Sequence, residues 1–252
     1  MKSIITGFIA FLFFIIIFIY GYQNSEHASE VKKQTIDLSH TDSKKYSIIK
    51  IKDNVLLNIP VISQFPELAR GCEVTSLSML LNSAGIKTDK LTLAKQIKKD
   101  ATPRKIINNN IHYGHPNDGF VGDMYTYSKP GLGVYVQPII ELANKYMPGK
   151  IVNLTKSSFE DLKIPLSNGQ PVWVIINTHY KELPDSYFTT WHTKKGTIRI
   201  TSKEHSVLIT GYDKDFIYFN DPLTGQKNKK APIHDFQEAW VQMGSQAITY
   251  QE

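Results

Sequence analysis

The stretch ARGCEVTSLSMLLNSAG, residues 69–85, carries the only cysteine of a 252-residue chain and the spacing of a buried helical face. After Cys72, apolar side chains recur at the intervals that place them on one side of an α-helix. They are Leu77, Leu80, Leu81 and Ala84. Gly85 is a typical stop for a helix. The pattern predicts a buried helix that begins at Cys72.

A cysteine at the start of a helix lies near the positive end of the backbone dipole. The unpaired N–H groups there also favour the thiolate, which is the reactive form of the side chain. Gly71 lets the backbone turn sharply and leaves space for a substrate. We therefore expect an activated nucleophile at Cys72. The alternative is a small, buried and inert apolar residue.

Further along the chain, helical patterns precede strand patterns. A helical first half followed by a strand-rich second half indicates an α+β fold. We predict a strand over 55–64, a helix over 88–100, an extended loop over 101–133, a helix that begins after Pro138 and runs to Tyr146, a central strand over 171–177, two strands with a turn at 213–215, and a last helix over 233–240.

A cysteine nucleophile needs a base, and the base needs a group that orients it. Among eight histidines, His205 is the best candidate because it begins a predicted strand that would fix its ring. Asp221 ends the next strand, so a hairpin would bring it beside His205. Asn220 would face the other way, because successive strand residues point to opposite sides. Alternatively, Asp221 and Pro222 only begin a turn.

At this point the chain resembles a known family, the papain-like cysteine peptidases of the bacteriocin-processing type (cysteine peptidase family 39), and especially their stand-alone exported bacterial relatives. Between about Leu56 and Trp240, three stretches carry the resemblance. They are IPVISQFPELARGCEVTSLSMLLNSAG (59–85), GFVGDMYTYSKPGLGVY (119–135) and HSVLITGYDKDFIYFNDPLTG (205–225).

The resemblance implies a papain-like α+β fold, in which an N-terminal helical part with the cysteine helix packs on an antiparallel sheet. That sheet would carry His205 and Asp221. The family's nucleophile falls on Cys72, its general base on His205, its orienting acid on Asp221 and its side-chain oxyanion donor on Gln64. An amide N–H beside the thiolate suits that last role. This chemistry requires no metal and no cofactor.

Two departures from the transporter-linked members of that family concern the catalytic loop. The spacing from Gln64 to Cys72 is longer, so the loop must bulge for Gln64 to reach the site. Gly71 stands where those members often have an acid. The chain also has no G-x-x-x-x-G-K-[ST] phosphate loop, so the double-glycine leader peptides of the transporter-linked branch are not transferred as substrates.

The N-terminal segment MKSIITGFIAFLFFIIIFIYGY, residues 1–22, has one lysine ahead of an uncharged apolar run. A helix of that run is just long enough to cross a bilayer, with tyrosines at the interface. We predict an uncleaved signal anchor, a polar tether over 23–54 and the peptidase domain over 55–252. The domain would lie outside the cytoplasm at the cell membrane. A cleaved signal peptide, with a weak cleavage site near Ala28, would make the protein secreted.

The charge composition of the chain indicates which kinds of partner to expect. Lys and Arg exceed Asp and Glu by 29 to 23, and the basic residues are scattered without an arginine-rich run. Nucleic acid is therefore not an expected partner. We expect a peptide or protein substrate, and no pattern in the chain indicates an oligomeric state.

Three other functions compete with peptide hydrolysis. Four residues of one loop could form a metal site, although no H-E-x-x-H motif is present; they are His112, His115, Asp118 and Asp123. An aromatic groove around 186–191 would suit an inactive module that binds the cell envelope. Acyl transfer would use the same three residues as hydrolysis. A serine hydrolase is disfavoured because no G-x-S-x-G occurs.

Overall fold

The computed structural model describes residues 51–252. The signal anchor predicted over 1–22 and most of the tether predicted over 23–54 lie outside this part. Within it, no helix has both the length and the apolar character that crossing a membrane requires. Lys52, three residues before the predicted domain boundary, already contacts the domain, because its backbone carbonyl accepts a 2.6 Å hydrogen bond from the Tyr212 hydroxyl.

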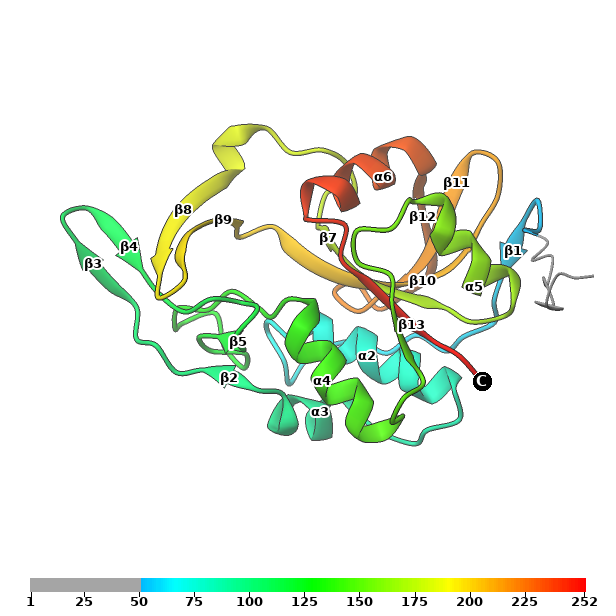
Figure 1. Ribbon diagram of the computed structural model, residues 1–252, viewed down its shortest axis with the longest axis horizontal. Coiled ribbons are helices and arrows are strands. Elements are labelled where there is room, and N and C mark those ends of the chain that lie inside the picture. Colours follow the sequence, from blue (N-terminus) through cyan, green and yellow to red (C-terminus); the bar gives the residue numbers. More distant parts are fainter. Residues whose placement is uncertain (1–50) are drawn as a thin grey trace, which may run out of the picture. The chain divides into compact units, whose positions relative to one another are not determined.

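A seven-stranded antiparallel sheet forms the centre of the fold (Figure 1). Its order is β12-β11-β10-β7-β13-β6, and β1 pairs with the C-terminal end of β10. The strands are β1 (Val55–Leu56), β6 (Ile151–Asn153), β7 (Val172–Asn177), β10 (Glu204–Tyr212), β11 (Phe216–Asp221), β12 (Gln226–Pro232) and β13 (Ala247–Tyr250).

Strand β7 is buried on both faces because its residues are apolar without alternation. Trp173 and Ile175 belong to one hydrophobic core, while Val172, Val174 and Ile176 belong to a second core on the opposite face. This position confirms the expectation that the continuous apolar run forms a central strand.

Helices cover both faces of this sheet (Figure 1). On one face lie α2 (Cys72–Ser83), α3 (Lys90–Gln96) and α4 (Val136–Tyr146), with side chains in the first core. On the other face lie α6 (Ile233–Gln242), α5 (Lys163–Ser167) and the short 3-10 helix η2 (Glu160–Leu162). Helices segregated around an antiparallel sheet define an α+β fold, so the predicted fold class is confirmed.

Local signals located the ends of the helices. Gly85 follows α2 with a φ of 82°, a value at which glycine has no steric penalty. The Asp89 side chain caps α3 by accepting from the backbone N–H groups of Leu91 and Thr92. The strand predicted over 55–64 was too long, since only Val55 and Leu56 pair.

The loop predicted over 101–133 was wrong in part, because it contains short strands. A separate four-stranded sheet joins β3 (Lys105–Ile107), β4 (Asn110–His112), β8 (Phe188–Thr193) and β9 (Gly196–Thr201). A parallel pair joins β2 (Lys99–Asp100) and β5 (Phe120–Val121), and the 3-10 helix η3 spans Asp185–Tyr187. The parallel pairing of Ile111 with Trp191 is a contact between distant segments, which local composition cannot reveal.

Candidate active site

Cys72 is the first residue of α2, as the sequence predicted. Gly71 precedes it as the N-cap, and a Cβ added there would lie 2.4 Å from the Leu68 Cβ. The chain can therefore turn into the helix only with glycine at this position, because any side chain would displace Leu68. The turn brings the Cys72 thiol to the N-terminal end of α2, where backbone N–H groups lack helical partners.

His205 and Asp221 come from neighbouring strands, β10 and β11, and their side chains meet. His205 Nε2 lies 2.9 Å from Asp221 Oδ1, and both residues are buried. Asn220 faces away from this pair, where its Nδ2 donates to the Ile59 carbonyl and its Oδ1 accepts from the Asn228 N–H. The pleat of β11 thus directs Asp221, and not Asn220, toward the histidine.

Several groups besides His205 donate hydrogen bonds to Asp221. Oδ2 accepts from the Tyr180 hydroxyl at 2.9 Å, the Thr224 hydroxyl at 2.7 Å and Lys229 Nζ at 2.9 Å, and Oδ1 accepts from the Leu223 N–H. Burial by itself would raise the pKa of this carboxyl. The hydrogen bonds and charges of His205 and Lys229 outweigh burial and hold the pKa well below its usual range.

Gln64 lies on the loop that leads to Cys72. This loop turns tightly, with the Leu68 N–H donating to the Gln64 carbonyl at 3.0 Å, and the Gln64 N–H is held by the Pro222 carbonyl at 2.9 Å. The Gln64 Nε2 donates to the carbonyls of Leu68 and Ala69, while its Oε1 has no hydrogen-bond partner. Both amide hydrogens are therefore engaged, and the predicted oxyanion role requires that one be released.

A cavity of about 260 Å³ brings three of the four predicted residues together. Cys72, His205 and Gln64 line it, although they come from α2, β10 and the loop before α2. Asp221 does not line it and lies behind the His205 ring. The wall also includes Glu204 and Tyr127. The fold thus assembles a thiol, an imidazole and an amide around one opening, with a carboxylate held behind the imidazole.

The sequence predicted that the start of α2 would favour the thiolate form of Cys72. The surroundings of the thiol have the opposite effect on its pKa. Burial raises the pKa of Cys72 well above its ordinary value, and the carboxyls of Glu73 and Glu204 raise it further. The Ser206 backbone N–H opposes this effect only in part. The expectation was wrong because desolvation and two acids outweigh the helix terminus. Cys72 rests as a neutral thiol.

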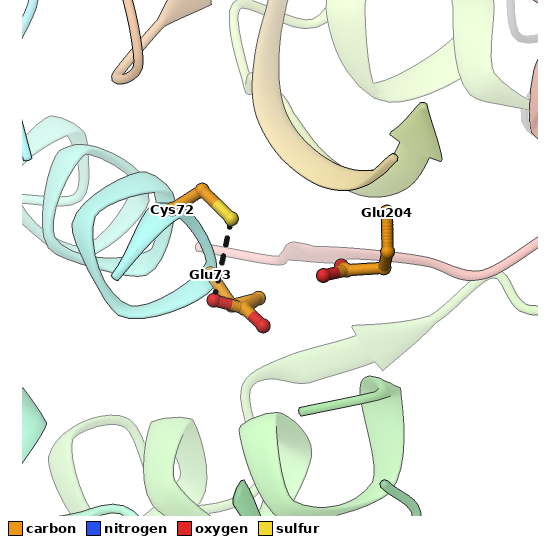
Figure 2. Close-up of side chains that lie close together, drawn as sticks. All are labelled: Cys72, Glu73 and Glu204. Carbon is orange, nitrogen blue, oxygen red and sulfur yellow. Dashed lines mark hydrogen bonds between the residues drawn. The ribbon is translucent and has the colours of Figure 1, made fainter. Parts of the chain in front are cut away.

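Figure 2 shows the two acids beside the thiol. The Cys72 Sγ donates to Glu73 Oε2 at 3.3 Å, and the Val134 N–H donates to Glu73 Oε1 at 2.6 Å. Glu204 Oε1 has no hydrogen-bond partner. Burial raises the pKa of Glu73 to about 7, and burial and the nearby Glu73 raise that of Glu204 well above its usual range.

Sequence analysis missed these two acids, as well as Tyr180 and Lys229. Glu73 follows Cys72 directly and lies within a helix segment that is otherwise apolar or small, and Glu204 precedes His205. Their positions beside the two principal residues were a usable signal. Tyr180 and Lys229 had none, since their contacts with Asp221 depend on tertiary packing.

The alternative metal site on the 112–123 loop is not assembled. His112 stacks on His192 with ring centroids 4.8 Å apart, and Asp118 pairs with Lys195. Asp123 accepts from the backbone N–H groups of residues 125 and 126. Across residues 51–252, these four side chains do not form a cluster with metal-ligand spacing.

A family model, described as Peptidase_C39 like family, matches residues 56–248 of this sequence. The chain belongs to this family. The match includes all four predicted site residues, and the resemblance found from sequence motifs is therefore confirmed.

Two proteins of Bacillus are similar to this chain over most of its length. The chain is 44% identical over 223 residues to the Bacillus subtilis (strain 168) protein YvpB, which is described as uncharacterized; this covers 87% of the present chain and 86% of YvpB. A crystal structure of a protein from Bacillus anthracis that is described as C39-like aligns with a TM-score of 0.74 at 47% identity. It covers 80% of this chain and 98% of that one. The C39-like fold is thus shared with a chain of solved structure.

Proposed function

We propose that this protein is a thiol peptidase that hydrolyses peptide bonds with Cys72 as nucleophile. The observation that carries the proposal is the cavity lined by Cys72 and His205, with Asp221 bonded to the far side of the imidazole. A nucleophile, a base and an orienting acid in this order form the constellation used for acyl chemistry. Membership of the C39-like family supports the same reaction.

Because Asp221 accepts from His205 Nε2, the proton on that nitrogen is fixed and Nδ1 is left to act as the base. The thiol is neutral at rest, so its proton moves to Nδ1 when a bound peptide excludes water and its carbonyl is attacked. Asp221 then stabilises the imidazolium. The same proton is returned to the leaving amine, and water resolves the thioester.

The oxyanion of the tetrahedral intermediate needs donors beside the sulfur. The Cys72 backbone N–H belongs to the first turn of α2, where N–H groups have no helical acceptor. Gln64 lines the same cavity and provides the second donor once substrate displaces one of its bonds to the Leu68 and Ala69 carbonyls. Binding of the substrate would thus complete the site.

We further propose that residues 1–22 anchor the peptidase to the cell membrane and that residues 23–54 hold it away from the surface, outside the cytoplasm. The apolar run with one preceding lysine supports this arrangement. Its substrate is then a peptide or protein exposed in the envelope.

The test is peptide cleavage by the full-length protein in detergent, with fragments of a peptide mixture identified by mass spectrometry. We expect wild type to cleave, and Cys72→Ala and His205→Ala to lose activity by orders of magnitude with unchanged circular dichroism. His234→Ala is the matched control, since this exposed histidine lies on α6. A Cys72→Ala protein that cleaves at the wild-type rate would refute the mechanism.

The same assay addresses two alternatives. Adding a peptide amine as acceptor detects acyl transfer, since a ligated product would appear in place of a hydrolysed one. A protein that never cleaves, and whose retention on envelope material is unaffected by Cys72→Ala, would be the inactive binding module instead.

A further inference from the structure

We propose that Cys72, Glu73 and Glu204 form a binding site for a thiophilic divalent cation of the zinc class, which holds the thiol in an unreactive form. One ligand atom of each side chain lies within 4.8 Å of the others. In Figure 2 the three side chains, two from α2 and one from β10, point into the same space. The inhibitory consequence depends on the proposed function, whereas the binding does not.

No cation in the described part of the protein balances the charge that this site acquires when its carboxyls ionise. Both glutamates are buried, and no lysine or arginine among residues 51–252 forms an ion pair with either. Arg70 lines the nearby cavity, but its guanidinium donates to the carbonyls of Asp123 and Thr126. Buried carboxylates need a cation, a proton or several hydrogen-bond donors. Asp221 has such donors, whereas this pair has few.

Glu204 provides the independent sign of a ligand. Its side chain is buried to more than nine tenths, its Oε1 has no hydrogen-bond partner, and its carboxyl is directed at the other two groups. Gly133 closes the far side, where an added Cβ would lie 2.1 Å from Glu73 Oε1 and 2.6 Å from Glu204 Oε2. Backbone thus packs against both carboxyls, and only glycine permits this approach.

The spacing of the three side chains suits a metal ion. One ligand atom of each lies within 4.8 Å of the others. Bonds of about 2.3 Å to sulfur and about 2.1 Å to oxygen place tetrahedral zinc ligands about 3.5 Å apart. The Cys72 Sγ lies 3.3 Å from Glu73 Oε2. Glu204 can rotate inward without losing a hydrogen bond at Oε1.

Ligand chemistry also selects the class of cation. A thiolate with two carboxylates suits zinc, whereas magnesium and calcium avoid sulfur. Cys72 and Glu204 both line the 260 Å³ cavity, so an ion can enter there and keep a water as its fourth ligand. Binding releases the thiol proton, and any carboxyl proton, to solvent without a change of oxidation state. Coordination draws electron density from the sulfur and so weakens it as a nucleophile toward a carbonyl.

The test titrates metal-free full-length protein with Co²⁺, whose bond to a thiolate gives a charge-transfer band in the near ultraviolet. We expect one equivalent to produce the band and Zn²⁺ to displace it. Cys72→Ala should abolish the band, and Glu204→Gln should weaken Co²⁺ binding about tenfold or more. No band in the wild type would overturn the proposal.

Two controls locate the site. Glu238→Gln, in an exposed cluster on α6 with His234 and Asp235, should leave the band unchanged. His205→Ala should also keep it, because the proposed ligands do not include the imidazole. A band lost in His205→Ala but kept in Glu204→Gln would mean that metal binds Cys72 and His205, which overturns the proposal.

Activity separates this proposal from the proposed function. If the protein cleaves peptides, Zn²⁺ should inhibit it and a chelator should restore the rate; unaffected cleavage at saturating Zn²⁺ would refute the inhibitory role. If the protein cleaves no peptide, but Glu204→Gln weakens the binding that produces the cobalt band, then the metal site is supported and the peptidase proposal fails.

Discussion

One buried acidic region lies beside Cys72 and another beside His205, and the two differ in their hydrogen-bond donors. Asp221 accepts from an imidazole, a phenol, a hydroxyl, a backbone N–H and the ammonium of Lys229. Glu73 accepts from one backbone N–H and the thiol, and Glu204 Oε1 accepts from nothing. Burial is similar, so the donors decide which acid keeps its charge. Asp221 is a fixed anion, whereas the glutamates respond to a proton or a cation.

The largest effect should come from removing the fixed charge. Asp221→Asn should lower kcat for peptide cleavage on the order of 10³-fold or more, because the imidazole loses the acid that fixes its tautomer. Steady-state kinetics of the full-length protein would measure this. Asp215→Asn, in the exposed turn of the same hairpin, is the control. A kcat within about twofold of wild type would show that another group orients His205.

The second effect concerns stability, because the two regions should depend on pH in opposite ways. Glu73 has a folded pKa of about 7 against an ordinary 4.5, so the folded state binds more protons in this window. Stability should therefore fall as pH rises from 4.5 to 7, by about 3 kcal/mol. Asp221, with its lowered pKa, stabilises above pH 3.8 and loses that contribution below it.

Urea unfolding across pH 4 to 8 in metal-free buffer would measure this slope. Glu73→Gln should flatten the decline between pH 4.5 and 7. The groups facing Glu73 are Cys72, Glu204 and Tyr135. An unchanged slope in the variant would mean that Glu73 is not the titrating group.

A smaller effect should appear in thiol reactivity. In the alkaline range where Cys72 titrates, Glu204 adds a negative charge that raises the thiol pKa. Glu204→Gln should therefore increase the rate of iodoacetamide alkylation at a fixed pH by about tenfold for each unit by which the pKa falls. Cys72 is the only cysteine, so the signal is unambiguous. A rate at or below that of wild type would contradict the repulsion.

The smallest effect should come from one donor among several. Tyr180→Phe removes one hydrogen bond to Asp221 and leaves Lys229, Thr224 and the Leu223 N–H in place. We expect a loss of about 1 kcal/mol in unfolding free energy and a kcat change of only a few fold. Tyr187→Phe, at an exposed site, is the control. A loss as large as that of Asp221→Asn would show that the donors are not redundant.

Local sequence patterns were sufficient to predict the helix and strands that carry the site residues. The helix at Cys72, its end before Gly85, the buried strand and the hairpin are each determined by residues close together in sequence. The strand period also distinguished Asp221 from Asn220. Pairings between distant segments, such as β4 with β8, could not be predicted in this way, because the sequence of neither strand indicates which strand it pairs with.

The sequence by itself determined the family, the fold class and the positions of Cys72, His205, Asp221 and Gln64, since motif and period are local properties. Only the tertiary structure decided how these groups are charged. Burial and the packing of Glu204 against Cys72 raise the thiol pKa above what a helix terminus provides. Such electrostatic balances arise between residues far apart in sequence, because desolvation and charge act through space and not along the chain.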